Sequence, residues 1–213
     1  MLKKLLTSFL GVFRDDSATV LFPGFGVQPE NYVVKFPTQH VIRLNIWSEE
    51  DYNNIYLIGY PGTRSYRRWF EEKAAACLHN LTQELEHLGA KKVVYFGHSL
   101  GSQLAHHIAE KTGSPVISYG GLPYPEKNYK QLTLLGTHDK IVAKYYSKWP
   151  ERTLPVSNGN HFSCVNEDGK ARAEKWRKKL GMRKVYESAD DDQVTRKQID
   201  DHLHEFYKSL YVV

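Results

Sequence analysis

A serine between two glycines stands at the junction of an apolar run and a helical run. Residues 97–101 read Gly-His-Ser-Leu-Gly, so Gly97 and Gly101 flank Ser99 symmetrically. β-Branched and aromatic residues precede this pentapeptide, and residues 102–109 follow it with a helical pattern. Glycines allow the tight strand-to-helix turn that exposes such a serine, and the N–H groups that open the helix can bind an oxyanion. The sequence therefore predicts nucleophilic chemistry at Ser99, with Gly97 and Gly101 as the elbow glycines.

A serine hydroxyl needs a base within hydrogen-bond reach, and that base needs an acceptor that fixes its tautomer. Of the ten histidines, His161 lies in a polar loop, residues 157–162, directly after the last predicted strand. In a parallel sheet this loop emerges at the same edge as the serine turn. Most other histidines fall in predicted helices, and His98 lies inside the turn, where its side chain cannot easily reach back to its neighbour. We therefore expect His161 to be the general base.

Asp139 is the carboxylate that the same argument selects. It follows a predicted strand at residues 132–135, and its loop reaches the same edge of the sheet. There it can accept the histidine Nδ1–H and stabilise the imidazolium. Glu126 and Asp168 are alternative carboxylates with a less favourable position relative to the strands. We expect Ser99, His161 and Asp139 to act together, with no metal and no cofactor.

Strands alternate with helices along most of the chain. Apolar runs predict strands at residues 18–22, 41–47, 55–59, 92–96, 116–119, 132–135 and 152–156, and helical patterns predict helices at 65–87, 102–111 and 194–210. Which of the runs at 41–47 and 55–59 is a central strand stays open, and Pro155 favours a sheet edge for the last run. The alternation predicts an α/β fold with a mainly parallel sheet and helices on both faces. The expected inward positions are Trp69, Ala74, Ala76, Cys77, Leu81 and Leu85 in the first helix, and Ile199, Leu203, Phe206 and Leu210 in the last.

Size and charge limit the remaining alternatives. With 213 residues, of which 41% are hydrophobic, the chain can bury one large core, so we expect a single domain at residues 18–213. Its two cysteines lack metal-ligand spacing and favour a reduced, cytoplasmic setting. The net charge is +5, and residues 170–184 are strongly basic. That stretch is either the solvated face of a helix or a surface for anionic lipids or an acidic protein, whereas no motif points to nucleic acid.

Residues 1–17 form an amphipathic N-terminal segment. The leucines and phenylalanines of residues 1–13 share one helical face, opposite Lys3 and Lys4. The segment is too short to span a bilayer, and no small-residue cleavage site follows it. Three interpretations stay open, namely a helix packed on the main domain, a peripheral membrane contact, and an uncleaved targeting segment. The expected location is cytoplasmic, with or without membrane association, and the sequence leaves the oligomeric state open.

The order Ser99, Asp139, His161 is that of the α/β-hydrolases, and the chain resembles a compact member of this superfamily from about residue 18 to residue 162. The Pro-Gly-Phe-Gly of residues 23–26 is similar to the family's oxyanion loop, although Pro23 stands where the family frequently has a histidine. The resemblance extends to residues 97–101, 136–142 and 159–161. It implies that the backbone N–H groups of Phe25 and Leu100 bind the oxyanion. It also implies a reduced sheet of about six strands and no lid domain, since only residues 120–131 separate two predicted strands.

Within that superfamily, residues 118–123 and 136–142 are similar to the lidless carboxylesterase branch, which includes lysophospholipases and acyl-protein thioesterases. The pentapeptide Gly-His-Ser-Leu-Gly departs from that branch and is similar to many lipases. The resemblance implies a serine hydrolase that cleaves carboxylic esters or thioesters of small molecules or lipids through an acyl-enzyme, as a lipase, esterase or lysophospholipase does. Phe25, Leu122, Tyr124 and Phe162 are the expected lining of an apolar cleft. The alternative is a catalytically silent binding protein or peripheral membrane protein with the same fold.

Overall fold

The computed structural model describes residues 16–51, 63–122, 124–125, 127–142, 153–179, 181 and 192–211. The predicted strand at residues 55–59 and the amphipathic face of residues 1–13 lie outside the described residues. The strands are β1 (Ser17–Phe22), β2 (His40–Arg43), β3 (Lys92–His98), β4 (Val116–Tyr119), β5 (Gln131–Gly136) and β6 (Thr153–Val156). The helices are η1 (Pro29–Asn31), α3 (Arg64–His87), α4 (Leu100–Thr112), α5 (Glu167–Lys179) and α6 (Asp192–Tyr211).

The described strands form one six-stranded sheet in the order β2-β1-β3-β4-β5-β6. Every pairing in it is parallel, which confirms the predicted α/β fold with a parallel sheet of about six strands. Strand β6 lies at one edge, as its proline predicts. All carboxyl ends of the strands therefore meet at the same edge of the sheet, and this is the edge where the predicted site residues follow β3, β5 and β6.

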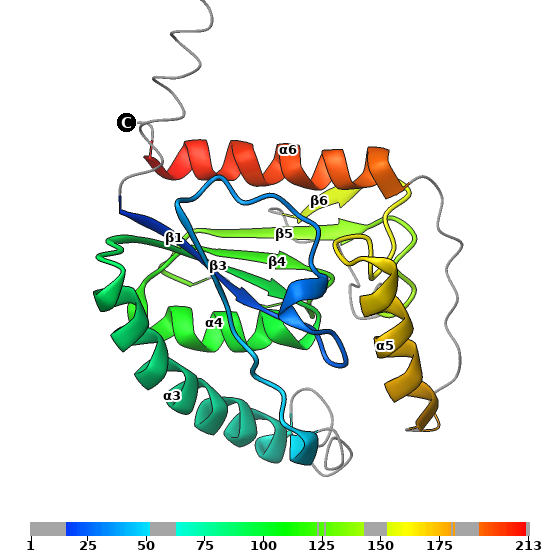
Figure 1. Ribbon diagram of the computed structural model, residues 1–213, viewed down its shortest axis with the longest axis horizontal. Coiled ribbons are helices and arrows are strands. Elements are labelled where there is room, and N and C mark those ends of the chain that lie inside the picture. Colours follow the sequence, from blue (N-terminus) through cyan, green and yellow to red (C-terminus); the bar gives the residue numbers. More distant parts are fainter. Residues whose placement is uncertain are drawn as a thin grey trace, which may run out of the picture.

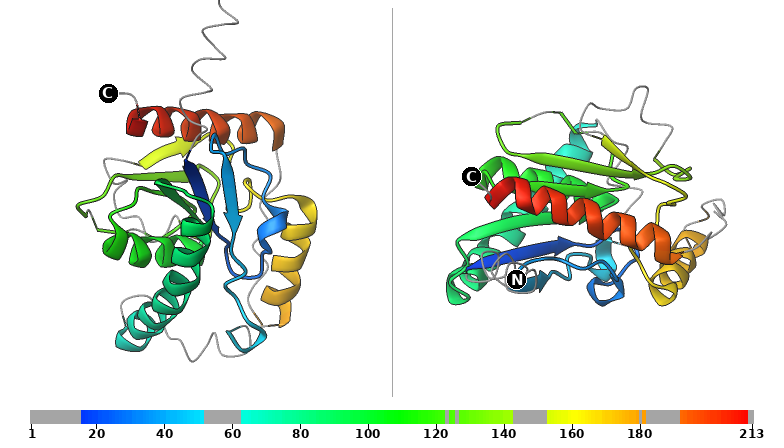
Figure 2. Two further views of the ribbon diagram at one scale, coloured as in Figure 1. Left: turned by 60° about the vertical axis from the view of Figure 1, so that its left-hand side comes forward. Right: turned by 90° about the horizontal axis from the view of Figure 1, so that it is seen from above.

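Helices cover both faces of the sheet (Figures 1 and 2). Alternate residues of one strand point to opposite faces, so each strand contributes to two cores. Val20 of β1 packs in a core that includes Phe70 of α3 and Ile108 of α4. Leu21, the next residue of β1, packs in a second core that includes Leu203 of α6. The central strands are thus buried from both sides, which gives the loops at their carboxyl ends a rigid base.

Two of the sequence expectations need correction in detail. The strand predicted at residues 41–47 ends at Arg43, because β2 pairs only with β1 and β1 itself ends at Phe22. In α3 the buried positions are Tyr66, Phe70, Ala74 and Leu81, and the other predicted positions are half-buried or, for Ala76, exposed. The helix packs along a stripe of four-residue steps, so the aromatic side chains at 66 and 70 fill the core in place of Trp69.

The basic stretch begins in α5, which lies beyond the carboxyl ends of the strands (Figures 1 and 2). This helix packs on the loop that follows β1, where a Cβ added to Gly26 would lie 3.1 Å from the Ala173 Cα. Lys175, Lys178 and Lys179 face solvent. At the other end of the chain, α6 buries Ile199 and Leu203 as predicted, whereas Phe206 and Leu210 are only half-buried. Tyr207, which the prediction did not include, is fully buried. Among the helices that the structure describes, none is long and apolar enough to cross a membrane.

Candidate active site

Ser99 lies at a strained turn between β3 and α4. Its backbone has φ 53° and ψ −123°, a conformation that a residue with a side chain rarely adopts. Strand β3 ends at His98 and α4 begins at Leu100, so the turn has no spare residue. Two backbone hydrogen bonds hold it, because the Ser99 N–H donates to the Tyr119 carbonyl at 3.0 Å and the Ser102 N–H donates to the Ser99 carbonyl at 3.1 Å. The backbone of Ser99 is therefore fixed at the carboxyl edge of the sheet, which is where the sequence places it.

Both flanking glycines sit where no side chain fits. A Cβ at Gly97 would lie 2.4 Å from the Ser102 Cα, and a Cβ at Gly101 would lie 2.2 Å from the Phe22 carbonyl oxygen. These neighbours are backbone atoms, which cannot move aside without shifting β1 or α4. The glycines thus let α4 pack close to the strands on either side of the turn.

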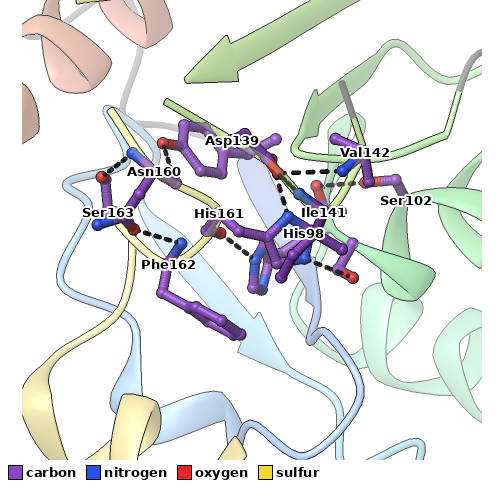
Figure 3. Close-up of polar contacts among 12 residues, drawn as sticks. His98, Ser102, Asp139, Ile141, Val142, Asn160, His161, Phe162 and Ser163 are labelled. Atoms are coloured by element: carbon purple, nitrogen blue, oxygen red, sulfur yellow. Dashed lines mark hydrogen bonds and ion pairs between the residues drawn. The ribbon is translucent and has the colours of Figure 1, made fainter. Parts of the chain in front are cut away.

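The three residues predicted to act together are in contact, and Figure 3 shows the two of them that are buried, Asp139 and His161. His161 Nε2 lies 2.9 Å from Ser99 Oγ, and His161 Nδ1 lies 2.8 Å from Asp139 Oδ2. Asp139 and His161 are buried, whereas Ser99 is half-buried and open to solvent. A hydroxyl, an imidazole and a carboxylate in this order can pass the serine proton to Nε2, while the carboxylate holds the other nitrogen as a donor.

Asp139 is oriented by the backbone of its own loop. Its Oδ1 accepts the N–H of Ile141 at 3.0 Å and the N–H of Val142 at 3.1 Å. This leaves Oδ2 for the imidazole (Figure 3). The carboxylate is 1% exposed, so water does not compete for these contacts. Of the alternative carboxylates, Asp168 is exposed in the first turn of α5, and Glu126 lies outside the described residues.

The His161 loop is fixed by contacts on both sides of the histidine. The Tyr119 hydroxyl donates to the Asn160 carbonyl at 2.7 Å, and the Asn160 N–H donates to Ser163 Oγ at 2.9 Å. The Phe162 N–H in turn donates to Asn160 Oδ1 at 2.8 Å. The turn therefore presents the imidazole to Ser99 with little freedom, which is what proton transfer over a short distance requires.

Sequence reasoning missed Gly120, the residue after β4. It has φ 55°, and a Cβ there would lie 3.0 Å from both Asp139 Oδ2 and His161 Nδ1. A side chain at this position would push between the carboxylate and the imidazole. In the sequence, the only sign of this role is that two glycines follow a predicted strand. Glycine pairs are common in turns of any kind, so the pattern does not point to an active site.

Sequence reasoning also missed Tyr32, and it considered His98 only as a base and set it aside. His98 is fully buried, and its ring contacts the Tyr32 hydroxyl through Nδ1 and the His161 carbonyl through Nε2, both at 2.8 Å. Burial lowers the pKa of His98 to about 3. The side chain does turn away from Ser99, as the sequence argument expects, but it turns onto the backbone of the general-base candidate.

The predicted oxyanion donors lie on the two segments that flank Ser99. Leu100 is the first residue of α4, where the helix leaves its N–H groups without partners in the helix. Phe25 belongs to the loop after β1, and this loop approaches the serine closely, since a Cβ at Gly24 would lie 3.1 Å from the Ser99 Cβ. Both N–H groups therefore come from segments beside the hydroxyl, and their role as donors is part of the proposal below.

Aromatic side chains surround part of the site. The ring of Phe162 packs edge-on against His161, with 5.0 Å between the ring centroids, and Phe25 packs against Trp47 at 6.0 Å. Tyr124, in contrast, stacks on His106 of α4, with 4.3 Å between the ring centroids. Its ring therefore packs against α4, and not against Phe25 or Phe162. In the part of the chain that the structure describes, no cluster of three or more histidine, cysteine and carboxylate side chains is arranged to hold a metal ion.

Comparisons with known proteins find solved structures that are similar at low sequence identity. No protein-family model matches the chain, and no curated protein sequence matches it significantly. It is similar to the RedJ thioesterase of the prodiginine pathway in Streptomyces coelicolor, with 13% identity over 75% of this chain and 89% of that one, and a TM-score of 0.48. It is also similar to an α/β hydrolase from the metagenome of Mar Chica lagoon sediments in Morocco, with 11% identity over 79% and 93% of the two chains and a TM-score of 0.48. A dienelactone hydrolase-like promiscuous phosphotriesterase from metagenomic libraries matches with 16% identity over 79% and 85%, at a TM-score of 0.47.

The chain's own features identify its architecture. The sheet is parallel with β1 between β2 and β3, the serine turn follows the central strand β3, and the loops after β5 and β6 bring a carboxylate and a histidine to that turn. This is the arrangement that the sequence resemblance implies. The chain has the α/β-hydrolase fold.

Proposed function

We propose that the protein is a serine hydrolase that cleaves carboxylic ester or thioester bonds through a Ser99–His161–Asp139 triad and an acyl-enzyme. The observation that carries this proposal is the unbroken contact from Ser99 Oγ through the His161 ring to Asp139, at 2.9 and 2.8 Å. Each of these residues follows a different strand, and the strained backbone of Ser99 serves to expose its hydroxyl. Structural glycines and buried contacts hold this geometry.

In the first half-reaction Ser99 Oγ attacks the carbonyl carbon as His161 Nε2 takes its proton. Asp139 accepts the Nδ1–H and stabilises the imidazolium that forms. The carbonyl oxygen becomes an oxyanion, which the N–H groups of Phe25 and Leu100 bind. When the tetrahedral intermediate collapses, Nε2–H donates its proton to the leaving alcohol or thiol, and the acyl group stays on the serine. Water then attacks the acyl-enzyme by the reverse sequence, with Nε2 again as the base.

For the substrate we propose an acyl group of medium or long chain length, in a small-molecule or lipid ester. Phe25 and Phe162 lie on the loops next to the triad and offer apolar surface to such a chain. For the location we propose the cytoplasm, and for residues 1–13 a peripheral membrane contact. Flotation with anionic vesicles, done with and without residues 1–13, tests that contact, and equal flotation of the two proteins would contradict it.

The direct test of the hydrolase proposal is labelling with a fluorophosphonate, which reacts with activated serines. We expect one stoichiometric label, located on Ser99 by peptide mapping, and none in the Ser99→Ala variant. The Ser114→Ala variant, changed in the turn after α4, serves as the control and should label like the wild type. Nitrophenyl esters and acyl thioesters of increasing chain length then define the preferred substrate. A folded protein that takes no label and cleaves no ester would favour the silent binding protein instead.

A further inference from the structure

Two loops on opposite sides of Ser99 are joined by one buried chain of hydrogen bonds. The backbone N–H of Gly24, in the loop after β1, donates to the Tyr32 hydroxyl at 2.7 Å. The Tyr32 hydroxyl contacts His98 Nδ1 at 2.8 Å, and His98 Nε2 contacts the carbonyl oxygen of His161 at 2.8 Å (Figure 3 shows the His98 to His161 contact). These hydrogen bonds thus connect the loop that carries Phe25 with His161, the residue that contacts Ser99.

Chemistry allows only one direction for these bonds. A carbonyl oxygen only accepts, so His98 Nε2 must carry a hydrogen. Because burial lowers the pKa of His98 to about 3, the ring is neutral at neutral pH and Nδ1 carries a lone pair. The Tyr32 hydroxyl therefore donates to Nδ1 and accepts from Gly24. Every group in the chain is satisfied, and reversing any bond would leave two donors or two acceptors face to face.

The packing around His98 is as tight as the hydrogen bonding. A Cβ at Gly24 would lie 2.6 Å from His98 Nδ1, so the loop after β1 rests directly on the imidazole. The Tyr32 ring packs edge-on against His98, with 5.6 Å between centroids, and His161 packs at 5.1 Å on another side. His98 itself cannot move, because it is the last residue of the central strand β3. It is therefore a fixed point between two loops that both have to meet the substrate carbonyl.

We propose that Tyr32 and His98 are positioning residues, which together set the distance between the oxyanion-binding loop at residues 23–27 and the general base His161. This inference rests on the proposed hydrolase function, because it concerns the geometry of that reaction. His98 is fully buried and Tyr32 is 5% exposed, so neither side chain is placed to touch the substrate. Their effect is on the transition state, in which the N–H of Phe25 and the imidazole of His161 must act on the same tetrahedral centre from two sides.

The neutral state of His98 is part of this role. During the reaction His161 becomes an imidazolium, and a second positive ring at 5.1 Å would oppose that charge. A buried neutral ring does not. It can also keep donating to the His161 backbone while the His161 side chain gains and loses its proton, so the anchor does not change through the cycle.

The test compares two variants that make the same chemical change. Tyr32→Phe removes the hydroxyl that links Gly24 to His98. Tyr129→Phe is the matched control, since Tyr129 is also 5% exposed and its hydroxyl contacts Nδ1 of another buried histidine, His106, at 2.9 Å. The second pair lies between α4 and the loop before β5. Both variants lose one buried tyrosine–histidine hydrogen bond, so any difference in catalysis reports on position and not on stability alone.

For Tyr32→Phe we expect kcat to fall about tenfold or more with KM within about twofold, since a small misplacement of reacting groups costs up to about 10²-fold in rate. Tyr129→Phe should keep kcat within about twofold of wild type. A further variant, His98→Gln, keeps both an amide N–H group and an amide oxygen, so it retains a donor for the His161 carbonyl and an acceptor for the Tyr32 hydroxyl. It should be more active than His98→Leu, which loses both contacts, and this partial rescue separates the effect of the hydrogen bonds from that of packing alone.

Histidine side-chain ¹⁵N spectra give a readout that does not depend on activity. They should show His98 as the neutral Nε2–H tautomer, with no proton on Nδ1, from pH 8 to about pH 4. Equal kcat in Tyr32→Phe and wild type, or an Nδ1–H tautomer at His98, would overturn the inference. Where wild type cleaves esters and Ser99→Ala does not, either of these two outcomes overturns the positioning role and leaves the proposed function standing. If wild type neither labels nor cleaves, the proposed function fails, and the positioning role fails with it.

Discussion

The substitution Asp139→Asn tests the tautomer on which the proposed reaction depends. In the structure, Oδ1 accepts two backbone N–H groups, from Ile141 and Val142, and Oδ2 accepts the His161 Nδ1–H. An asparagine has only one acceptor oxygen. If that oxygen stays with the two backbone groups, the amide NH₂ faces His161, and Nδ1 must become an acceptor. The ring hydrogen then moves to Nε2, which can no longer take a proton from Ser99.

The opposite orientation of the amide is costly. Turning the NH₂ toward Ile141 and Val142 would leave one buried and one part-buried N–H group without an acceptor, at about 1–3 kcal/mol for the buried one. Switching the tautomer of a neutral imidazole costs much less. We therefore expect a well-folded variant with the wrong tautomer, and a fall in kcat of about 10⁴, as the equivalent change produces in a Ser-His-Asp protease. That factor corresponds to about 5.4 kcal/mol of activation free energy.

The assay is steady-state hydrolysis of a nitrophenyl ester, together with urea unfolding of the same samples. Asp51→Asn is the matched control, because Asp51 is another buried carboxylate, bound by Ser48 and Lys73 away from the triad. It should lose stability and keep its kcat. If Asp139→Asn retains more than about a tenth of the wild-type kcat/KM, the tautomer argument is wrong.

Two further predictions concern residues that position the site. Gly120→Ala should lower kcat strongly, because its Cβ would lie 3.0 Å from both members of the carboxylate–imidazole pair. The control Gly113→Ala, also at positive φ but with no atom within 4 Å, should lose about 1–2 kcal/mol of stability and no activity; equal activities in the two variants would argue against the clash. Stability should also fall with acid, because burial lowers the pKa of His98 and of His106 to about 3, so below about pH 6.5 only the unfolded chain binds these protons. Between pH 7.5 and pH 5 each of these two histidines should lower the free energy of unfolding by about 2 kcal/mol, and His106→Gln should remove about 2 kcal/mol of the loss. The measurement is urea unfolding, and a flat profile would mean that these rings are not held neutral.

The sequence predicts the fold well where local pattern and topology agree. The runs before Ser99 and Asp139 are short, apolar and followed by polar loops, and such runs in alternation with helices have few arrangements other than a parallel sheet. Once the sheet is parallel, loops after its strands share one edge. That rule places Ser99, Asp139 and His161 at the same edge of the sheet, and the strand order, which the sequence does not predict, brings them into contact.

What the sequence does not predict depends on contacts between distant segments. The link from Gly24 through Tyr32 to His98 exists because β1 pairs with β3 and because the short helix η1 brings residue 32 under the turn. No spacing along the chain signals that contact. The inward face of α3 is missed for a similar reason, since tryptophan, tyrosine and phenylalanine in its first turns are equally apolar and only packing against α4 decides which of them is buried.

The central claim is that Ser99 forms a covalent acyl intermediate. The most direct measurement is mass spectrometry of protein mixed with a nitrophenyl ester and quenched in acid within the first turnover. We predict a mass increase equal to one acyl group, on the peptide that contains Ser99, which disappears in Ser99→Ala together with the hydrolysis. An acyl group on another residue, or hydrolysis that continues unchanged in Ser99→Ala, would contradict the account.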